Sequence, residues 1–332
     1  METYSVRLAE FLPEYCSLDV IALPGRSDGG APSALKVGLF GLRSFFGILV
    51  RPQVDVTHIG DLATWPLALA GKIRNPRSGV VVSAHGTDVS FALRHKLVNR
   101  AYRAYLSAFR VLMPSARIIA NSKATADALK AAGLTAHAIV PLAADQRNGP
   151  PAGAPGRHIL FAGRMTRRKG LSWFVENVVD ALPPGITLKV AGPAWDASEA
   201  KALDHPRVEY LGTLTQNELD PAYRNALCVI VPNLDMSIQH FEGFGLVAPE
   251  AASSGGVVLG ARTAGLSDAI RDGETGFLLP PGDAQAWRDK IVEIASWSEE
   301  TRRSFTQRSQ DICRVHFSWA RVARETFEQY GL

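Results

Sequence analysis

Two glutamates eight residues apart carry the strongest chemical signal in the chain. Glu242 and Glu250 lie in the segment PNLDMSIQHFEGFGLVAPEAASSGG, which follows an apolar run at 228–231. Glycines flank Phe244, and a helix is expected to begin near Gly245, which places Glu250 about two turns into it. The free N–H groups at a helix start suit a diphosphate, and a carboxylate on that helix can accept both hydroxyls of a ribose. A helix cap beside a surface acid is the simpler alternative.

A run of basic residues follows a second apolar strand. The segment ILFAGRMTRRKG turns at Gly163 and then supplies Arg164, Arg167, Arg168 and Lys169. Basic side chains at the carboxyl end of a strand can offset the charge that builds on a departing diphosphate. A solvated charged surface is the alternative explanation.

The third candidate is a histidine at the end of a buried strand. In VVVSAHGTDVS, His85 follows the apolar run at 80–84 and precedes Gly86. Ligands of open α/β sheets bind outside the carboxyl ends of the strands, so His85 is placed to bond a substrate hydroxyl. A purely structural histidine is the alternative.

Alternating short strands and longer helices are expected to position these residues. The predicted strands are 18–23, 54–58, 80–84, 117–121, 138–140, 158–162, 187–191, 208–211, 228–231 and 257–260, and the predicted helices of the first half are 34–50, 63–73, 91–113 and 123–132. This alternation is typical of parallel α/β sheets. The Pro- and Gly-rich stretch 148–156 reads as a linker. We therefore expect two Rossmann-like, doubly wound α/β domains that face a cleft, with the boundary at residues 150 and 151.

Composition excludes several classes of protein. The chain has 332 residues, 46% hydrophobic and 20% charged, as in ordinary globular domains. Its three cysteines lie far apart, which argues against a disulfide framework or a zinc site. The net charge of +4 is uneven, with +7 in residues 1–150 and −3 in the rest. A basic first half suggests an anionic partner there, although the basic residues are not interleaved with aromatic ones as in nucleic-acid-binding proteins.

Taken together, these segments resemble glycosyltransferase family 4. The matching features are the two glutamates, the G-R-x4-K of Gly163–Lys169, the H-G-x-D of His85–Asp88, Asn121 with Ser122, and the segments 210–232, 271–283 and 317–330. They cover nearly the whole chain in the family's order. The resemblance implies a GT-B fold, in which residues 151–316 bind the nucleotide sugar, residues 1–150 face the acceptor, and a helix in 317–332 packs back towards the first domain. It also implies transfer with retention of anomeric configuration.

The resemblance assigns a role to each candidate residue. Arg164 and Lys169 would hold the donor diphosphate, Glu250 the ribose, and Glu242 the transferred sugar, which His85 would meet from the opposite domain. The catalytic set is then His85, Glu242, Arg164 and Lys169, and the donor-binding set is Gly163, Arg164, Lys169, Phe244, Gly245, Leu246 and Glu250. The resemblance implies that no metal ion and no cofactor beyond the donor is needed, and the absence of a D-x-D motif supports the lack of a metal ion.

The start of the chain departs from the family pattern. Family members open with a strand and a glycine-rich loop, whereas METYSVRLAEFLP looks like the helix that follows them. We expect Met1 to be an internal methionine, with the first strand of the N-terminal domain missing from this sequence. That strand would be central in the first sheet.

The predicted function is transfer of a hexose from a nucleoside diphosphate sugar to a hydroxyl of a glycan or lipid-linked acceptor, in surface polysaccharide or glycolipid synthesis. The expected location is the cytoplasm, at the inner face of the membrane. The segment 34–50 carries two basic residues among bulky apolar ones, so it either contacts a membrane or packs on the sheet. The alternative functions are a catalytically inactive subunit that binds a nucleotide sugar and a nucleotide-sugar epimerase of the same fold.

Overall fold

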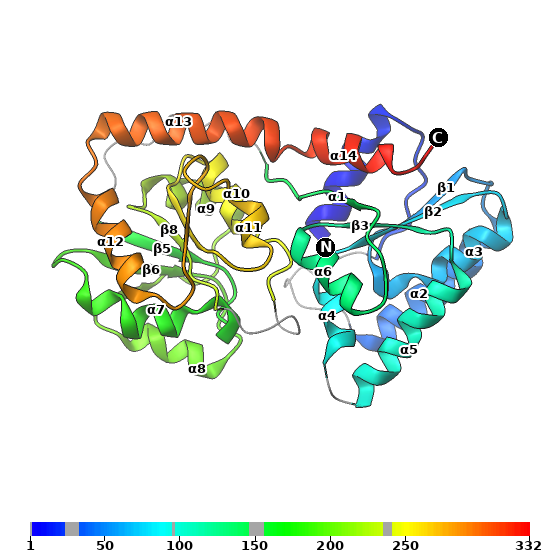
Figure 1. The fold of residues 1–332 in the computed structure, drawn as a ribbon, viewed down its shortest axis with the longest axis horizontal. Helices are drawn as coiled ribbons and strands as arrows, with labels where there is room; N and C mark the ends of the chain where they lie inside the picture. Colours follow the sequence, from blue (N-terminus) through cyan, green and yellow to red (C-terminus); the bar gives the residue numbers. More distant parts are fainter. Residues whose placement is uncertain (1, 24–32, 95–96, 146–155, 235–240) are drawn as a thin grey trace. The chain divides into compact units, whose positions relative to one another are not determined.

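A computed structural model describes residues 2–23, 33–94, 97–145, 156–234 and 241–332 (Figure 1). These residues form two compact units: unit 1 comprises Met1–Pro141 and Trp319–Leu332, and unit 2 comprises Leu142–Ser318. The division between Pro141 and Leu142 falls nine residues before the predicted one. The linker predicted at 148–156 lies outside the described residues except for Gly156.

Unit 1 is built on a parallel sheet in the order β1-β2-β3-β4. The strands are β1 (Val56–Ile59), β2 (Gly79–Ala84), β3 (Arg117–Ala120) and β4 (Ala138–Ile139). All four were predicted within two residues, because β-branched runs such as that of β2 favour strands that are buried on both faces. The order reversal of a doubly wound sheet does not occur among these four strands.

The strand predicted at Leu18–Leu23 is wrong. These residues form no helix or strand, and Leu18 and Val20 are exposed to solvent. A strand needs a neighbour for its backbone N–H and C=O groups, and no described strand pairs with this segment.

Helices cover the sheet of unit 1. They are α1 (Glu2–Phe11), α2 (Ala34–Val50), α3 (Pro66–Arg74), α4 (Thr87–Leu93), α5 (Leu97–Leu112), α6 (Lys123–Ala131) and α14 (Trp319–Glu328). The helix predicted at 91–113 is two helices, because Arg94 is extended and ends α4. The helix predicted from residue 63 starts at Pro66, whose fixed φ favours the first helical position. Helix α14 packs against α1 within this unit.

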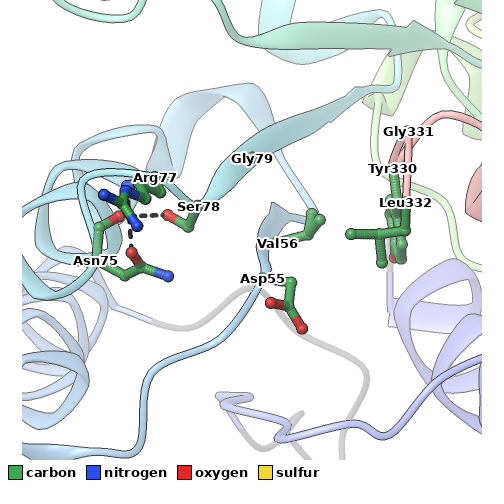
Figure 2. Close-up of a pocket in the computed structure, with 9 residues that line it drawn as sticks. All are labelled: Asp55, Val56, Asn75, Arg77, Ser78, Gly79, Tyr330, Gly331 and Leu332. Atoms are coloured by element: carbon green, nitrogen blue, oxygen red, sulfur yellow. Dashed lines mark hydrogen bonds between the residues drawn. The ribbon is translucent and has the colours of Figure 1, made fainter.

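A chain of buried and partly buried hydrogen bonds ties both terminal segments to this sheet. Ser83 Oγ of β2 lies 2.7 Å from the hydroxyl of Tyr4 and 2.9 Å from Nε2 of His58. Nδ1 of His58 lies 2.9 Å from the hydroxyl of Tyr330, which follows α14. A cavity of about 320 Å³ opens at the amino ends of β1 and β2, beside the last three residues of the chain (Figure 2). It is at the opposite edge of the sheet from His85.

Unit 2 has a six-stranded parallel sheet in the order β10-β9-β8-β5-β6-β7. The strands are β5 (His158–Ala162), β6 (Thr187–Ala191), β7 (Val208–Tyr210), β8 (Val229–Val231), β9 (Val258–Ala261) and β10 (Phe277–Leu279). The sequence predicted all but β10. The chain order reverses between β5 and β8, which makes this unit doubly wound and makes the crevice above these two strands the expected ligand site.

Helices surround this second sheet. They are α7 (Leu171–Asn177), α8 (Ala197–Ala200), α9 (Gln216–Asn225), α10 (Val247–Ser253), α11 (Leu266–Ala269), α12 (Ala284–Ala295) and α13 (Glu299–His316). Helix α9 begins with a capping box of Thr215 and Glu218, and α13 begins at Ser298, whose hydroxyl accepts the N–H of Thr301. Trp287 of α12 is fully buried and anchors that helix to the core.

Candidate functional site

Two loops meet where the chain order of unit 2 reverses. The loop after β5 contains a short 3-10 turn, Arg167–Lys169, that ends at Gly170 with a φ of +72°. A Cβ atom at Gly170 would lie 2.2 Å from the carbonyl oxygen of Pro232, which follows β8. The N–H of Leu234 donates to the carbonyl of Arg168 at 3.0 Å. The backbone therefore clamps the basic loop against the loop that leads to Glu242.

Glu242 is the centre of a charge cluster between these loops. Its Oε2 lies 2.5 Å from Nη1 of Arg168 and 2.5 Å from Nζ of Lys169. The side-chain amide of Asn233 donates to the same oxygen at 3.1 Å. The Glu242 side chain is 15% exposed and that of Lys169 is 12% exposed, so water screens these pairs only partly.

The cluster keeps Glu242 ionised. Burial by itself raises the pKa of this carboxyl, but the charges of Lys169 and Arg168 outweigh burial and hold its pKa at about 2. The site thus presents a fixed carboxylate with two cations on one oxygen. Such an arrangement can bond sugar hydroxyls through the carboxylate while the cations attract a phosphate.

The turn before α10 is set by glycines. Gly245 has a φ of +91°, and a Cβ there would lie 2.5 Å from Leu266. Helix α10 therefore starts at Val247, later than the predicted start near Gly245. Glu250 is consequently about one turn into the helix, and the predicted two turns are wrong. The N–H groups of Phe244, Gly245 and Leu246 donate to no backbone carbonyl of the described residues.

Glu250 contacts the neighbouring helix. Tyr223 of α9 is buried, and its pKa lies well above the usual value because of burial and because of the Glu250 carboxylate, to which its hydroxyl hydrogen-bonds. Glu250 is half-buried. The contact fixes the direction in which this carboxylate points.

Arg164 contacts a different partner. Its guanidinium carbon lies 4.4 Å from the centre of the Trp195 ring, which follows β6. The preceding Gly163 has a φ of +141° and donates its N–H to the carbonyl of Ala191. Of the residues predicted for the donor site, the structure brings Lys169 directly to Glu242, whereas Arg164 and Glu250 have other partners.

In unit 1, His85 sits at the carboxyl end of β2. Gly86 after it has a φ of +99°, which starts α4 at Thr87. The carboxylate of Asp88 accepts the N–H of His85 at 3.0 Å, and the amide of Asn121 donates to the carbonyl of His85. His85 is therefore fixed by the loop that carries it and by the end of the adjacent strand β3.

Burial favours the neutral forms of both His85 and Asp88. Burial lowers the pKa of His85 to about 4, and burial together with Asp61 raises the pKa of Asp88 to about 7. Nε2 of His85 lies 3.0 Å from the carbonyl oxygen of Gly60, so it must carry the proton. Nδ1 of the neutral ring is then a hydrogen-bond acceptor.

Three partners of the predicted residues escaped the sequence analysis: Asn233, Trp195 and Tyr223. The pairing of Arg168 with Glu242 escaped it as well. Arg168 was visible only as one of four basic residues, and nothing in the spacing singles it out. Trp195 carried a usable signal, since it follows the strand predicted at 187–191; in the structure it is 56% exposed. A large exposed aromatic at the carboxyl end of a strand is a candidate contact residue.

Two family models match the chain, one in each half. The model described as Glycosyltransferase Family 4 matches residues 2–145, and the model described as Glycosyl transferases group 1 matches residues 156–296. Between them they include the His85 loop, the basic loop and both glutamates.

Individual curated proteins are similar to part of the chain. D-inositol 3-phosphate glycosyltransferase of Corynebacterium efficiens is 29% identical over 203 residues, which are 57% of this chain and 46% of that protein. The counterpart from Nocardia farcinica is 32% identical over 54% of this chain and 41% of that protein. The chain thus spans about half the length of the curated relatives that it matches.

A solved structure shares the fold. The Anabaena protein Alr3699/HepE, in complex with UDP, superposes with a TM-score of 0.68 at 18% identity and covers 91% of this chain and 84% of that chain. At this identity the likeness concerns the fold. With both halves matched in order and the fold shared, the chain belongs to glycosyltransferase family 4.

Proposed function

We propose that this protein transfers a hexose from a nucleoside diphosphate sugar to a hydroxyl acceptor with retention of anomeric configuration. The bond between the anomeric carbon and the leaving phosphate oxygen breaks, and the acceptor oxygen bonds that carbon on the same face. The acceptor proton passes to the leaving phosphate oxygen. Catalysis then depends on orientation and on stabilising the diphosphate as it leaves.

The observation that carries this proposal is the cluster of Glu242, Arg168 and Lys169 at the reversal point of the unit 2 sheet. Lys169 and the exposed Arg164 supply positive charge, and the N–H groups of Phe244, Gly245 and Leu246 supply hydrogen-bond donors for phosphate oxygens. Gly163 leaves the space above β5 open, since no atom lies within 4 Å of a Cβ built there. Glu250 binds the ribose, and Glu242 contacts hydroxyls of the transferred sugar.

His85 contributes from unit 1. Because Nε2 of His85 donates its proton to the carbonyl of Gly60, Nδ1 is free to accept a hydrogen bond from a sugar hydroxyl. The neutral ring brings no charge to the sugar. The facing arrangement of the two units over a donor remains part of the proposal.

The first test is ligand-linked stability. We expect one of UDP, GDP or ADP, or one of their sugar conjugates, to stabilise unit 2 by about 2.7 kcal/mol at a hundred times its dissociation constant. Glu250→Ala should abolish most of that shift, whereas Glu274→Ala, in an exposed ion pair with Arg271, should not. No shift with any nucleotide, from folded protein, would remove the proposal.

Turnover and stereochemistry complete this test. The proton NMR spectrum of the product is expected to show the anomeric configuration of the donor, and an inverted product would contradict the retaining mechanism. Nucleotide binding without transfer to any hydroxyl acceptor would favour the inactive subunit, and interconversion of donor sugars would favour the epimerase. We expect turnover to survive a chelator, because the cations of the site are side chains.

We further propose that the acceptor is a glycan or lipid-linked sugar at the inner face of a membrane, as surface polysaccharide or glycolipid synthesis requires. Among the described residues no helix is long and apolar enough to cross a bilayer. The support is α2, where Leu35, Leu39, Leu42, Phe46 and Val50 are each more than half exposed. Their spacing of three or four residues places them on one side of the helix, opposite the buried Ser44.

Charge complements this apolar stripe. Lys36 and Arg43 are exposed beside it, and α2 contains no acidic residue. An apolar stripe edged by basic residues binds the surface of an anionic bilayer. Leu39→Ser with Phe46→Ser should reduce sedimentation with vesicles containing anionic lipid, and Val315→Ser, at an exposed apolar residue of α13, should not. Equal sedimentation of all three proteins would contradict membrane contact.

A further inference from the structure

We propose that Trp195 is a positioning residue that orients Arg164 towards the diphosphate of the donor, an inference that rests on the proposed function and adds a residue to its site. The Arg164 guanidinium lies over the indole ring at 4.4 Å. Both side chains are exposed at the carboxyl edge of the unit 2 sheet, one after β5 and the other after β6. A stacked guanidinium keeps its N–H donors in the plane of the group, where they can bond two phosphate oxygens.

The backbone fixes the place of the indole. The carbonyl of Met165 accepts the N–H groups of both Trp195 and Asp196 at 3.1 Å, and the N–H of Met165 donates to Pro193. The carboxylate of Asp196 accepts the N–H of Arg167 at 2.8 Å. The loop after β6 is therefore joined to the basic loop at Met165 and Arg167, directly after Arg164.

A glycine allows these two loops to approach so closely. Gly192 has a φ of +126°, and a Cβ atom there would lie 2.2 Å from the carbonyl oxygen of Gly163. Any side chain at Gly192 would separate the loops and move the indole away from Arg164. The stacking thus follows from the local fold and not from a chance surface contact.

The partner of Arg164 differs in kind from that of its neighbours. Arg168 and Lys169 share the carboxylate of Glu242. Arg164 forms no ion pair with any carboxylate of the described residues. A carboxylate would compete with an incoming phosphate for the guanidinium, whereas an aromatic face restricts the side chain and leaves its charge and donors available. This difference points to Arg164 as a phosphate contact whose guanidinium is oriented by the Trp195 ring.

The experiment compares nucleoside diphosphate binding with nucleoside binding by calorimetry. The affinities of UDP, GDP and ADP are each measured beside those of their nucleosides. The ratio of the two affinities gives the gain in affinity that the diphosphate provides. Trp195→Leu should reduce this gain about fivefold and leave nucleoside binding unchanged, as expected for a partly exposed cation–π contact. Trp195→Phe should recover most of the gain. Phe277→Leu removes a similar contact from Lys290, 4.6 Å away, and should change neither value.

Arg164→Ala decides whether the ring acts through the guanidinium. In that background Trp195→Leu should have no further effect on diphosphate binding. A further loss would mean that the indole touches the ligand itself, and equal binding by Trp195→Leu and the unchanged protein would mean that it does nothing; either result overturns the proposal. Failure of the unchanged protein to bind any nucleoside diphosphate would instead overturn the proposed function, and this inference with it.

Discussion

The candidate loops of the two units treat charge in opposite ways. In unit 2 the carboxyl of Glu242 is kept ionised, with its pKa at about 2, beside two cations. In unit 1 burial lowers the pKa of both His58 and His85 to about 4 and raises that of Asp88 to about 7. The difference matches the two ends of a nucleotide sugar, since a diphosphate calls for fixed charge and a sugar hydroxyl calls for a neutral hydrogen-bond partner.

The difference arises from the charged groups that surround each titratable side chain. Both loops follow buried strands, so both desolvate their titratable side chains. Only in unit 2 do opposite charges within salt-bridge distance overcome the cost of burial. In unit 1 the charge of Asp61 acts on Asp88, and its like sign adds to the effect of burial.

The largest expected effect comes from removing the charge at the centre of unit 2. Glu242→Gln should lower kcat at least about a hundredfold, the size seen when an electrostatic group is removed from a transfer site. Binding of the nucleoside diphosphate should not weaken, because Arg168 and Lys169 lose a competing anion. Calorimetry and initial rates on the same preparation separate the two effects. If Glu242→Gln weakened nucleotide binding as much as turnover, the carboxylate would serve binding alone.

Glu250→Ala should come next and act on binding. Loss of the hydrogen bonds from a ribose to this carboxylate is expected to weaken nucleotide binding about tenfold or more. Binding of the free diphosphate, measured with pyrophosphate, should hardly change, since α10 places Glu250 a turn beyond the Phe244–Leu246 N–H groups. An equal loss for nucleotide and pyrophosphate would show that the substitution disturbs the whole turn.

Replacing His85 tests whether a neutral side chain of unit 1 acts on the sugar. His85→Ala should lower kcat about tenfold and leave nucleoside diphosphate binding unchanged, because the ring meets only the sugar. With its pKa near 4, His85 should add no ionisation step near pH 6.5 to the dependence of kcat on pH. An ionisation step near pH 6.5 that disappears in His85→Ala would show that His85 acts as a charged imidazole. It would contradict the contrast between a neutral group in unit 1 and a charged cluster in unit 2.

Much of this fold could be predicted from residue patterns, because β-branched runs that end in Gly, Pro or a polar residue indicate buried parallel strands. The patterns failed where a partner decides the outcome. Leu18–Leu23 has the composition of a strand and no described strand beside it. Helix α10 starts late because Gly245, with a φ of +91°, lies outside the right-handed helical region.

The site was predictable as a set of loops and not as a set of contacts. Glu242 and Lys169 were found from residue type and position after strands. Arg168 lies 74 positions from Glu242, and their pairing depends on the clamp between Gly170 and Pro232. Neither the clamp nor the neutral state of His85 has a signature in residue spacing, since both follow from burial and three-dimensional contact.

The smallest expected effect concerns the stability of unit 1 against pH. A histidine whose pKa is lower in the folded protein stabilises it above pH 6.5, and this contribution is lost as the pH falls towards 4. Asp88 acts in the opposite direction: its raised pKa makes ionisation costly, so between about pH 7 and 4 it gives stability as the pH falls. Asp88→Asn keeps an acceptor for the N–H of His85 and removes the stability that Asp88 contributes as the pH falls. Its free energy of unfolding should therefore fall more steeply with acid than that of the unchanged protein, by about 1 kcal/mol per pH unit.

Urea unfolding at pH 5, 6 and 7 measures these slopes. Pulsed hydrogen exchange at one fixed pH reads the peptides of β1 and β2, because two units need not unfold together. Asp127→Asn, in an exposed ion pair with Lys123 of the same unit, is the control and should follow the slope of the unchanged protein. Parallel slopes for Asp88→Asn and the unchanged protein would mean that Asp88 ionises in place at its ordinary pKa. The carboxyl of unit 1 would then be charged like Glu242, and the contrast between the two loops would rest on the histidines alone.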